Sequence, residues 1–275
     1  MEPITEVVTP DGTFRTGCIA PSSAAVFAHI PVLADTVPIL SVDKAKEYID
    51  KKNYNSQDIF KGWIRNQGGR GSCNGYAGAK ALQRARMIRR QKFAELSGEG
   101  LYAQINGGQD QGSMLYDAMA KIMATGVPTT ASVPYEEYRF DRIKPAAWEE
   151  AKRFKGEELY AIKSEPELVT AHCLGFMVVV AVHAGSNWTR LTDTDMVPRS
   201  PGAGNHAVGV DDIRYSLQRS QFEYCHFGSW GESVHNQGYA WLSWNNHLAT
   251  TVGYHGFYAI RSTIDDPQDQ FPVVS

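Results

Sequence analysis

The sequence predicts an α+β protein built from two lobes that face each other across a cleft. Helical patterns fill the first part of the chain up to about residue 156, and beyond residue 158 apolar runs of strand length replace them. A helical half followed by a strand half is typical of separately packed layers rather than of alternating βα units. The chain has 275 residues, 43% of them hydrophobic, which is enough to bury a core in each lobe.

Composition and charge exclude several classes of partner. A formal net charge of −3 gives no overall attraction to nucleic acid or to an anionic membrane. The longest apolar run, residues 176–182, is too short to span a bilayer. The first residues lack the basic and then apolar pattern of a signal peptide. We therefore expect a cytoplasmic or virion-associated protein that binds neither nucleic acid nor membrane.

The cysteines give no sign of a metal site or of a disulfide framework. Four cysteines stand at positions 18, 73, 173 and 225, without a Cys-x-x-Cys pair. Zinc sites and small disulfide-stabilised domains are recognised by closely spaced cysteines, and that spacing is missing. We expect neither a metal nor another cofactor.

The chain begins with an extended arm, which we place at residues 1–47. Five prolines fall within the first 40 residues and no helical period is present. The arm can pack along the body of the same chain, cross the cleft or dock on a partner protein. A short helix at 41–51 would overlap its end, with Ala45, Tyr48 and Ile49 on the inner face. The helical lobe then covers residues 48–156 and the β-rich lobe residues 157–275.

The main helix of the first lobe is expected to begin at Cys73, with Ser72 as its N-cap. Small and apolar residues recur at helical spacing from Ala77 to Ile88 and predict a buried stripe. The opposite face is basic without interleaved aromatic residues, which favours a solvated surface over a nucleic-acid site. Its residues are Lys80, Arg84, Arg86, Arg89, Arg90 and Lys92.

Two further helices complete the first lobe. One is expected at 113–124, capped by Ser113 and stopped by Gly126, and another at 145–156, with Pro145 in its first turn. In the second lobe, runs rich in β-branched and aromatic residues predict strands. They cover 176–183, 206–215, 222–227, 239–244 and 256–260.

The segment Gln67-Gly-Gly-Arg-Gly-Ser-Cys73 has the features that a thiol nucleophile needs. Cys73 opens a helix, whose first turn carries a partial positive charge of about half an elementary charge and lowers the pKa of a thiol. Gly71 permits close approach of a substrate backbone. The Gln67 carboxamide and the Cys73 backbone N–H together can donate to a developing oxyanion. A structural cysteine beside a polar turn residue is the alternative.

Three downstream segments complete a pattern that resembles the papain-like cysteine peptidases, over about residues 48–260. They are Gly204-Asn-His-Ala-Val208, Gly228-Ser-Trp-Gly231 and Gly238-Tyr239. The resemblance implies a papain-like two-lobe fold: the nucleophile on the helical lobe, a histidine on an antiparallel, β-barrel-like lobe, and the active site between them. It assigns Cys73 as nucleophile, His206 as the base that takes the thiol proton, and Gln67 as oxyanion donor.

The sequence departs from this pattern around the histidine. Gly228 stands where the family has the asparagine that orients the ring, and two family tryptophans are replaced by Asn74 and Val234. Trp230 is retained. Either His226 or Asn74 supplies the orienting contact, or Trp230 alone supports the ring. An orienting group improves geometry without breaking bonds itself, so its loss predicts a slower enzyme before an inactive one.

The resemblance also implies a substrate-binding surface. Residues 112–116 match the family's glycine-rich wall, which hydrogen-bonds an extended peptide, with Ser113 in place of a family glycine. The small apolar pocket residues predict a preference for a large apolar side chain two residues before the cut. Ordinary core packing is the alternative for Leu115 and Ala181. The substrate-binding positions are Gly112, Ser113, Leu115, Ala181, Gly204, Ala207 and Trp230.

Three functions agree with these features. The first is a cysteine endopeptidase that hydrolyses peptide or protein substrates through an acyl-enzyme on Cys73. The second keeps this chemistry with another acceptor, as in an amidase or acyltransferase. The third is a weakly active or inactive papain-fold module used for assembly or adhesion, for example in a virion or a bacterial structural component.

Overall fold

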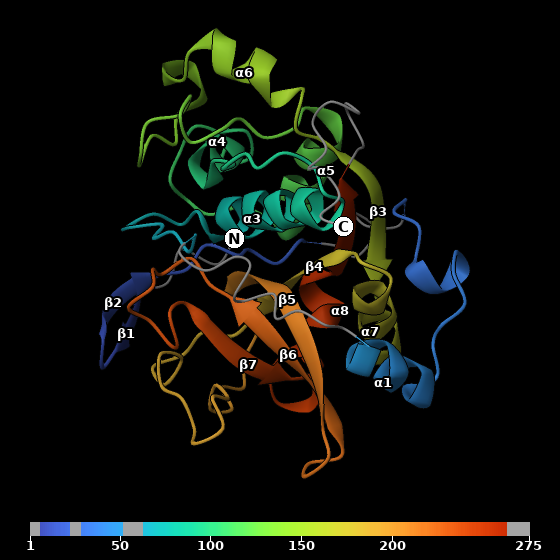
Figure 1. Cartoon of the computed structure of the whole chain (residues 1–275). Helices are drawn as coiled ribbons and strands as arrows, with labels where there is room; N and C mark the ends of the chain where they lie inside the picture. The colour runs from blue at the N-terminus through green and yellow to red at the C-terminus, as the bar shows by residue number, and fades with distance from the viewer. Residues whose placement is uncertain (1–5, 23–28, 52–62, 263–275) are drawn as a thin grey trace.

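Two lobes make up the part of the chain that the computed structural model describes, residues 6–22, 29–51 and 63–262 (Figure 1). Helices gather in one lobe and the main sheet in the other, as the sequence predicts. The helices of the first lobe are α3 (Cys73–Ile88), α4 (Gly98–Ala103), α5 (Leu115–Ala124) and α6 (Pro145–Ala151), with a 3-10 turn at Phe140–Arg142.

The second lobe is built on a six-stranded antiparallel sheet with the order β3-β8-β4-β5-β6-β7. This sheet is open, with β3 and β7 at its edges, and is not closed into a barrel. The expected strands are present with ends shifted by at most two residues, and β3 is additional. The strands are β3 (Gly156–Ile162), β4 (Met177–Val182), β5 (His206–Ser216), β6 (Gln221–Phe227), β7 (Tyr239–Ser243) and β8 (Phe257–Ser262).

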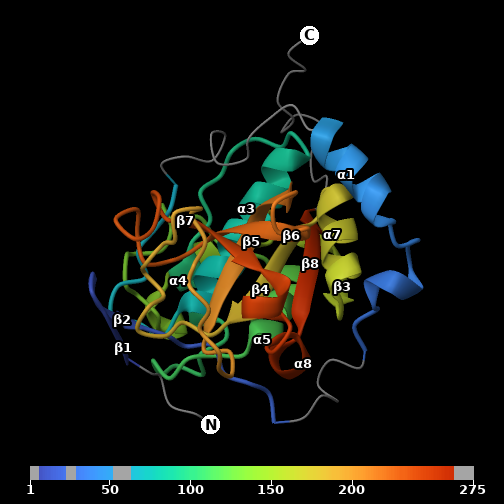
Figure 2. The ribbon, with the colours of Figure 1, turned by 90° about the horizontal axis from the view of Figure 1, so that it is seen from below.

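Helices on the outside of the β lobe were only partly expected. The helix α1 (Val42–Lys51) lies beside α7 (Glu165–Cys173) in both Figure 1 and Figure 2. The sequence did not predict α7, whose N-cap Ser164 accepts a hydrogen bond from the backbone of the first turn. In α1, Ala45 is buried as expected, but Tyr48 is 44% exposed and does not face inward. A π-helical turn (Trp244–Leu248) and α8 (Val252–His255) join β7 to β8.

The central helix α3 is buried on nearly all sides, so the expected solvated basic face is wrong within the helix, whereas Arg90 and Lys92, just beyond its end, are exposed as expected. It contacts α4 and α5 in its own lobe and β4, β5 and β8 in the other. Lys80, Arg84 and Arg86 are therefore all buried. Arg84 is paired with Asp211 of β5, and the Arg86 guanidinium lies 4.7 Å from the centre of the Phe154 ring. Buried charge is tolerated where such partners replace water.

Two predicted helix starts differ in detail. Ser72 does precede the first residue of α3, but its side chain makes no capping hydrogen bond. The helix α5 begins at Leu115 rather than at Ser113. Ser113 is extended instead, because its N–H donates to the carbonyl of Gly17 and its carbonyl accepts from the N–H of Ile19. The third helix, α6, ends at Ala151, and the chain enters β3 at 156.

The N-terminal arm lies on the body of the chain. It starts with an antiparallel hairpin of β1 (Glu6–Thr9) and β2 (Gly12–Arg15). Further on it reaches the edge of the sheet, where Val32 pairs in parallel with Ala161 and the Ala161 N–H donates to the Pro31 carbonyl at 2.9 Å. The arm therefore extends the sheet beyond β3 by a short contact.

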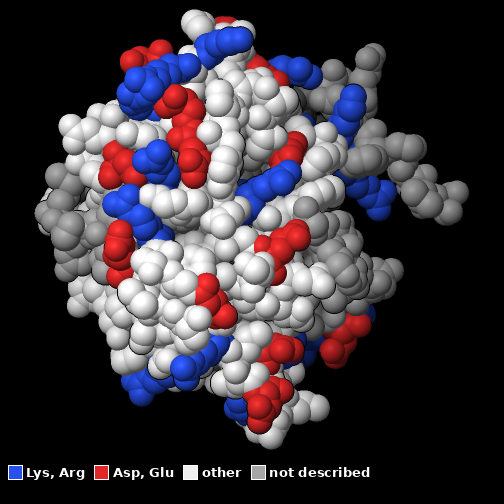
Figure 3. All heavy atoms as spheres, turned by 90° about the vertical axis from the view of Figure 1, so that its left-hand side faces the viewer, with Lys and Arg blue, Asp and Glu red and all other residues white. Residues whose placement is uncertain are grey.

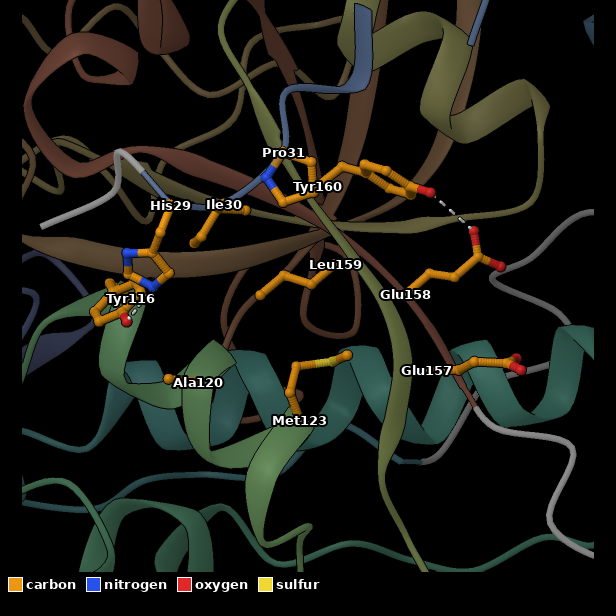
Figure 4. Close-up of a pocket in the computed structure, with 10 residues that line it drawn as sticks. All are labelled: His29, Ile30, Pro31, Tyr116, Ala120, Met123, Glu157, Glu158, Leu159 and Tyr160. Atoms are coloured by element: carbon orange, nitrogen blue, oxygen red, sulfur yellow. Dashed lines mark hydrogen bonds between the residues drawn. The ribbon is translucent and has the colours of Figure 1, made fainter. Parts of the chain in front are cut away.

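A pocket of about 450 Å³ lies beside this contact (Figure 4). Its walls come from the arm, from α5 and from β3, and the Tyr116 hydroxyl lies 2.8 Å from Nε2 of His29 at one end. Neither Cys73 nor His206 belongs to its lining. The pocket is therefore separate from the residues to which the sequence assigns chemistry.

Surface and cysteine chemistry agree with the composition. Acidic and basic side chains are interspersed on the face shown in Figure 3, without a field of one sign. All four cysteines are free. Within the described ranges, no helix is both long and apolar enough to cross a membrane.

Candidate active site

Cys73 and His206 come from opposite lobes, and the Cys73 thiol lies close to the start of the strand that carries His206. Cys73 is the first residue of α3 and His206 the first residue of β5. Backbone N–H groups of Ala207 and Gly17 approach the Cys73 sulfur. The thiol therefore lies against the residue that follows His206. Neither ring nitrogen of His206 has a hydrogen-bond partner among the described residues, so the thiol is placed beside the backbone of Ala207 without a thiol–imidazole hydrogen bond.

Burial sets the charge of both groups. The Cys73 thiol is completely buried, and this burial raises its pKa to about 11, against smaller opposing effects of the surrounding backbone N–H groups. Burial, helped by the nearby His235, lowers the pKa of His206 to about 3. The expected lowering of the thiol pKa at the helix start is thus outweighed by desolvation. At neutral pH the structure holds a neutral thiol and a neutral imidazole.

Gln67 joins the two lobes next to the thiol. Its N–H donates to the Ser229 carbonyl at 2.7 Å, and its side-chain oxygen accepts from the Ser229 hydroxyl. Its amide nitrogen donates to the carbonyls of Arg70 at 2.6 Å and Arg15 at 3.0 Å. The indole N–H of Trp230 points at the same Arg15 carbonyl from 3.3 Å. The Gln67 amide, which the sequence assigns as an oxyanion donor, therefore donates to a carbonyl of the arm instead.

The arm continues from Arg15 along the predicted substrate-binding wall. The Ser113 N–H donates to the Gly17 carbonyl, and the Ile19 N–H donates to the Ser113 carbonyl, each at 2.9 Å. On the other side, the Cys18 N–H donates to the carbonyl of Asn205, the residue before His206, at 3.0 Å. Residues 15–19 are thus held between the two lobes by backbone hydrogen bonds, parallel to the wall.

Two glycines make this close approach possible. A Cβ on Gly17 would lie 2.0 Å from the carbonyl oxygen of Gly71, in the turn before Cys73. A Cβ on Gly112 would lie 2.6 Å from the Gly17 oxygen, and Gly112 also has a positive φ of 83°. Such distances leave no room for any side chain. The arm and the glycine turns are fitted to each other.

Cys18 lies near the residues that the sequence assigns to the side-chain pocket, because it contacts His255, the neighbour of Gly204. Leu115, Ala181 and Ala207 are all buried, and the Cys18 sulfur lies 3.5 Å from Nδ1 of His255. His255 was missed from the sequence. It stands at the end of α8, just before β8, and no local pattern distinguishes it from the other histidines.

Gly204 also reaches this pocket. A Cβ on Gly204 would lie 2.7 Å from the His255 ring and 3.2 Å from the Ala181 methyl. Ala181 also pairs with Ala207 across β4 and β5, so Ala181, Gly204 and Ala207 lie close to one another, with His255 beside them.

Neither Asn74 nor His226 hydrogen-bonds the His206 ring, whereas Trp230, the third candidate from the sequence, contacts it. Asn74 donates to the Ser113 carbonyl at 2.6 Å and to the Ser113 hydroxyl at 3.2 Å, so it supports the wall. Within the described part of the chain, no hydrogen bond reaches either ring nitrogen of His206 or of His226. Trp230 contacts the His206 ring, with 4.7 Å between centroids. Gly228 leaves open space, since a Cβ there would meet nothing within 4 Å.

The family model described as papain family cysteine protease matches residues 46–260. The chain belongs to the papain family of cysteine proteases. A search of the curated proteins gives no match.

Solved structures of papain-like proteases share the fold at low identity. Xylellain, a cysteine protease from Xylella fastidiosa, is 18% identical, with a TM-score of 0.63 over 90% of this chain and 96% of that chain. The proCathepsin B S9 of Trypanosoma congolense is 12% identical, with a TM-score of 0.64 over 90% and 86%. Bromelain from Ananas comosus, in complex with the E64 inhibitor, is 17% identical, with a TM-score of 0.59 over 76% and 97%.

Proposed function

We propose that this papain-family protein is a cysteine endopeptidase that its own N-terminal arm holds in a latent state. The observation that supports the proposal is that backbone N–H groups of Ala207, next to His206, and of Gly17 in the arm approach the buried Cys73 sulfur, while the Gln67 amide donates to Arg15 of the same arm. Family membership implies peptide or protein substrates. The arm passes through the same point as an extended backbone, which is the shape of such a substrate.

The proposed reaction follows from these groups. The His206 imidazole takes the thiol proton, and the Cys73 sulfur attacks the scissile carbonyl carbon. The carbonyl oxygen becomes an oxyanion, stabilised by the Gln67 amide and the Cys73 N–H. Collapse breaks the C–N bond while the imidazolium protonates the leaving amine. Water, deprotonated by His206, then cleaves the thioester and releases the acid product.

Latency follows from what the arm occupies. The Arg15 carbonyl takes the hydrogen bond of Gln67 that the oxyanion would need, and Gly17 covers the thiol. Burial by the arm keeps the thiol protonated, and a protonated thiol is a poor nucleophile. Displacing residues 15–19 would admit both water and substrate. The thiol pKa would then fall, because desolvation is its main cause.

For specificity we propose a large apolar side chain at the second residue before the cut. Leu115, Ala181 and Ala207 supply an apolar surface, and the space that Cys18 now fills would become available once the arm leaves. His255 at the end of this space contributes a hydrogen-bonding group. A peptide library in which acidic or basic residues dominate this position would contradict the proposal.

The test uses the full chain carrying Gly17→Ala, which displaces the arm. We expect it to cleave a peptide library, and the same chain carrying Cys73→Ala in addition to be inactive. Mass mapping after iodoacetamide treatment should find Cys73 modified ahead of the other three cysteines. Slow and equal labelling of all exposed cysteines, without cleavage, would instead assign the protein to non-catalytic assembly or adhesion. Cleavage only in the presence of an amine acceptor would indicate a transferase.

A further inference from the structure

The His206 ring contacts two indoles that come from different parts of the β lobe. The Trp230 ring centroid is 4.7 Å away at an interplanar angle of 39°, and that of Trp188 is 6.2 Å away at 75°. Trp188 belongs to the long connection between β4 and β5, whereas Trp230 follows β6. Both indoles are buried, with Trp188 only 1% exposed. Two separate segments therefore close on one imidazole.

Orientation of this ring cannot come from a hydrogen bond to a described residue. Neither ring nitrogen of His206 has a hydrogen-bond partner within the described ranges, although the ring is fully buried. The position that could supply such a partner is Gly228, which has no side chain. A general base still needs a fixed orientation, because proton transfer depends strongly on geometry. Packing is the remaining way to provide it.

Trp188 is itself firmly held. Its carbonyl is 2.6 Å from Nε2 of His235, and its N–H donates to the Gly185 carbonyl at 2.9 Å. Its indole packs against two more imidazoles, with ring centroids 5.2 Å from His226 and 5.9 Å from His235. The indole therefore cannot turn away from His206 without breaking several contacts. A rigid wall of this kind can fix the plane of the ring that it touches.

We propose that Trp188 is a positioning residue for His206, forming with Trp230 an aromatic clamp that replaces an orienting hydrogen bond. Trp188 acts through the imidazole and takes no part in bond making. The clamp leaves the space at Gly228 unused. The inference rests on the proposed function as far as turnover is concerned, but the clamp has a physical signature of its own.

The decisive variant is Trp188→Phe, which keeps an apolar ring and the backbone bonds of residue 188. In the Gly17→Ala chain we expect kcat to fall at least about tenfold with KM within about twofold, since a small misplacement of a catalytic group costs this much or more. Gly228→Asn should restore at least about fivefold of the loss, whereas Gly228→Ala should restore none. Trp148→Phe, in α6 of the other lobe, is the matched control and should change neither parameter.

Without any mutation at Trp188, Gly228→Asn should raise kcat by less than about threefold, because the clamp already orients the ring. A gain of tenfold or more would show an unoriented histidine and overturn the proposal, even if Trp188→Phe fails to fold. Unchanged kcat in a folded Trp188→Phe chain would overturn it as well.

A second measurement does not depend on activity. Deuterium exchange at the C2 position of each histidine, read by peptide mass spectrometry, should be slow for His206 in the wild-type chain. It should accelerate at least about threefold in Trp188→Phe, since the loosened ring gains access to solvent. Exchange at the half-buried His183 should not change. If no chain turns over substrate but the exchange rates differ as expected, the proposed function is rejected and the role of Trp188 in fixing the His206 ring is supported.

Discussion

Replacing Gly17 by alanine should displace residues 15–19 of the arm from between the lobes. The size of the shift in this equilibrium can be worked out from the packing. The new methyl carbon would lie 2.0 Å from the Gly71 carbonyl oxygen, whereas ordinary contacts begin at about 3.4 Å. The clash is with backbone, so no side chain can rotate to relieve it. Overpacking of this kind costs about 1–3 kcal/mol. A tenfold change in an equilibrium corresponds to about 1.4 kcal/mol, so the displaced arm should become about five- to 150-fold more populated.

The assay is the rate of Cys73 alkylation by iodoacetamide at pH 7, with each cysteine quantified by mass spectrometry. Only the open state exposes the thiol, so the rate should rise by the same factor as the open population. Gly253→Ala is the matched control, because a methyl group at that helical position meets nothing within 4 Å. If Gly17→Ala folds normally and Cys73 reacts within about twofold of the wild-type rate, residues 15–19 do not control access, and the latency argument is wrong.

Three further predictions concern titration and stability. In the wild-type chain, the rate of Cys73 alkylation should rise as the pH approaches about 11, the pKa of the buried thiol. In Gly17→Ala this rise should occur at lower pH, because the thiol is less buried. Identical pH profiles of the two chains would contradict the conclusion that burial raises this pKa. The pKa of His206 is lowered to about 3 on folding, so the unfolded chain binds more protons between about pH 6.5 and 3, and stability should fall as the pH falls through that window. Urea titrations at several pH values should show that the free energy of unfolding falls less steeply with pH in His206→Gln than in the wild type, by up to about 1.4 kcal/mol per pH unit. Equal slopes in the two chains would refute this prediction. Arg84→Met should destabilise the chain by about 3–5 kcal/mol in the same assay, because Asp211 stays buried without its partner, and adding Asp211→Leu should recover most of that.

Local sequence patterns determined the elements that carry the chemistry. The helix that starts at Cys73 and the strand that starts at His206 are both where the sequence predicts them. The helix start is set by a glycine-rich turn followed by a helical stripe, and the strand by an uninterrupted apolar run. Both are signals carried by neighbouring residues, so they can be read without knowing the fold. The same holds for the two-lobe class.

The burial of individual side chains could not be predicted from local sequence patterns. Arg84 looks like a surface residue in the sequence, yet it is completely buried, because β5 of the other lobe covers that side of α3. The thiol of Cys73 illustrates the same limit. The helix start favours thiolate through local geometry, but burial of the thiol between the two lobes dominates and raises the pKa.

The sequence by itself determined the identity and order of the reactive groups: a thiol at a helix start, a carboxamide before it, and an imidazole at a strand start. Only the tertiary structure decided what surrounds them, namely residues 15–19 of the arm between the lobes, His255 beside Cys18 and Trp188 against the His206 ring. Backbone preference and helix polarity act between neighbours in the chain. Burial and ring contacts join residues that are distant in sequence, and they exist only after the lobes have packed.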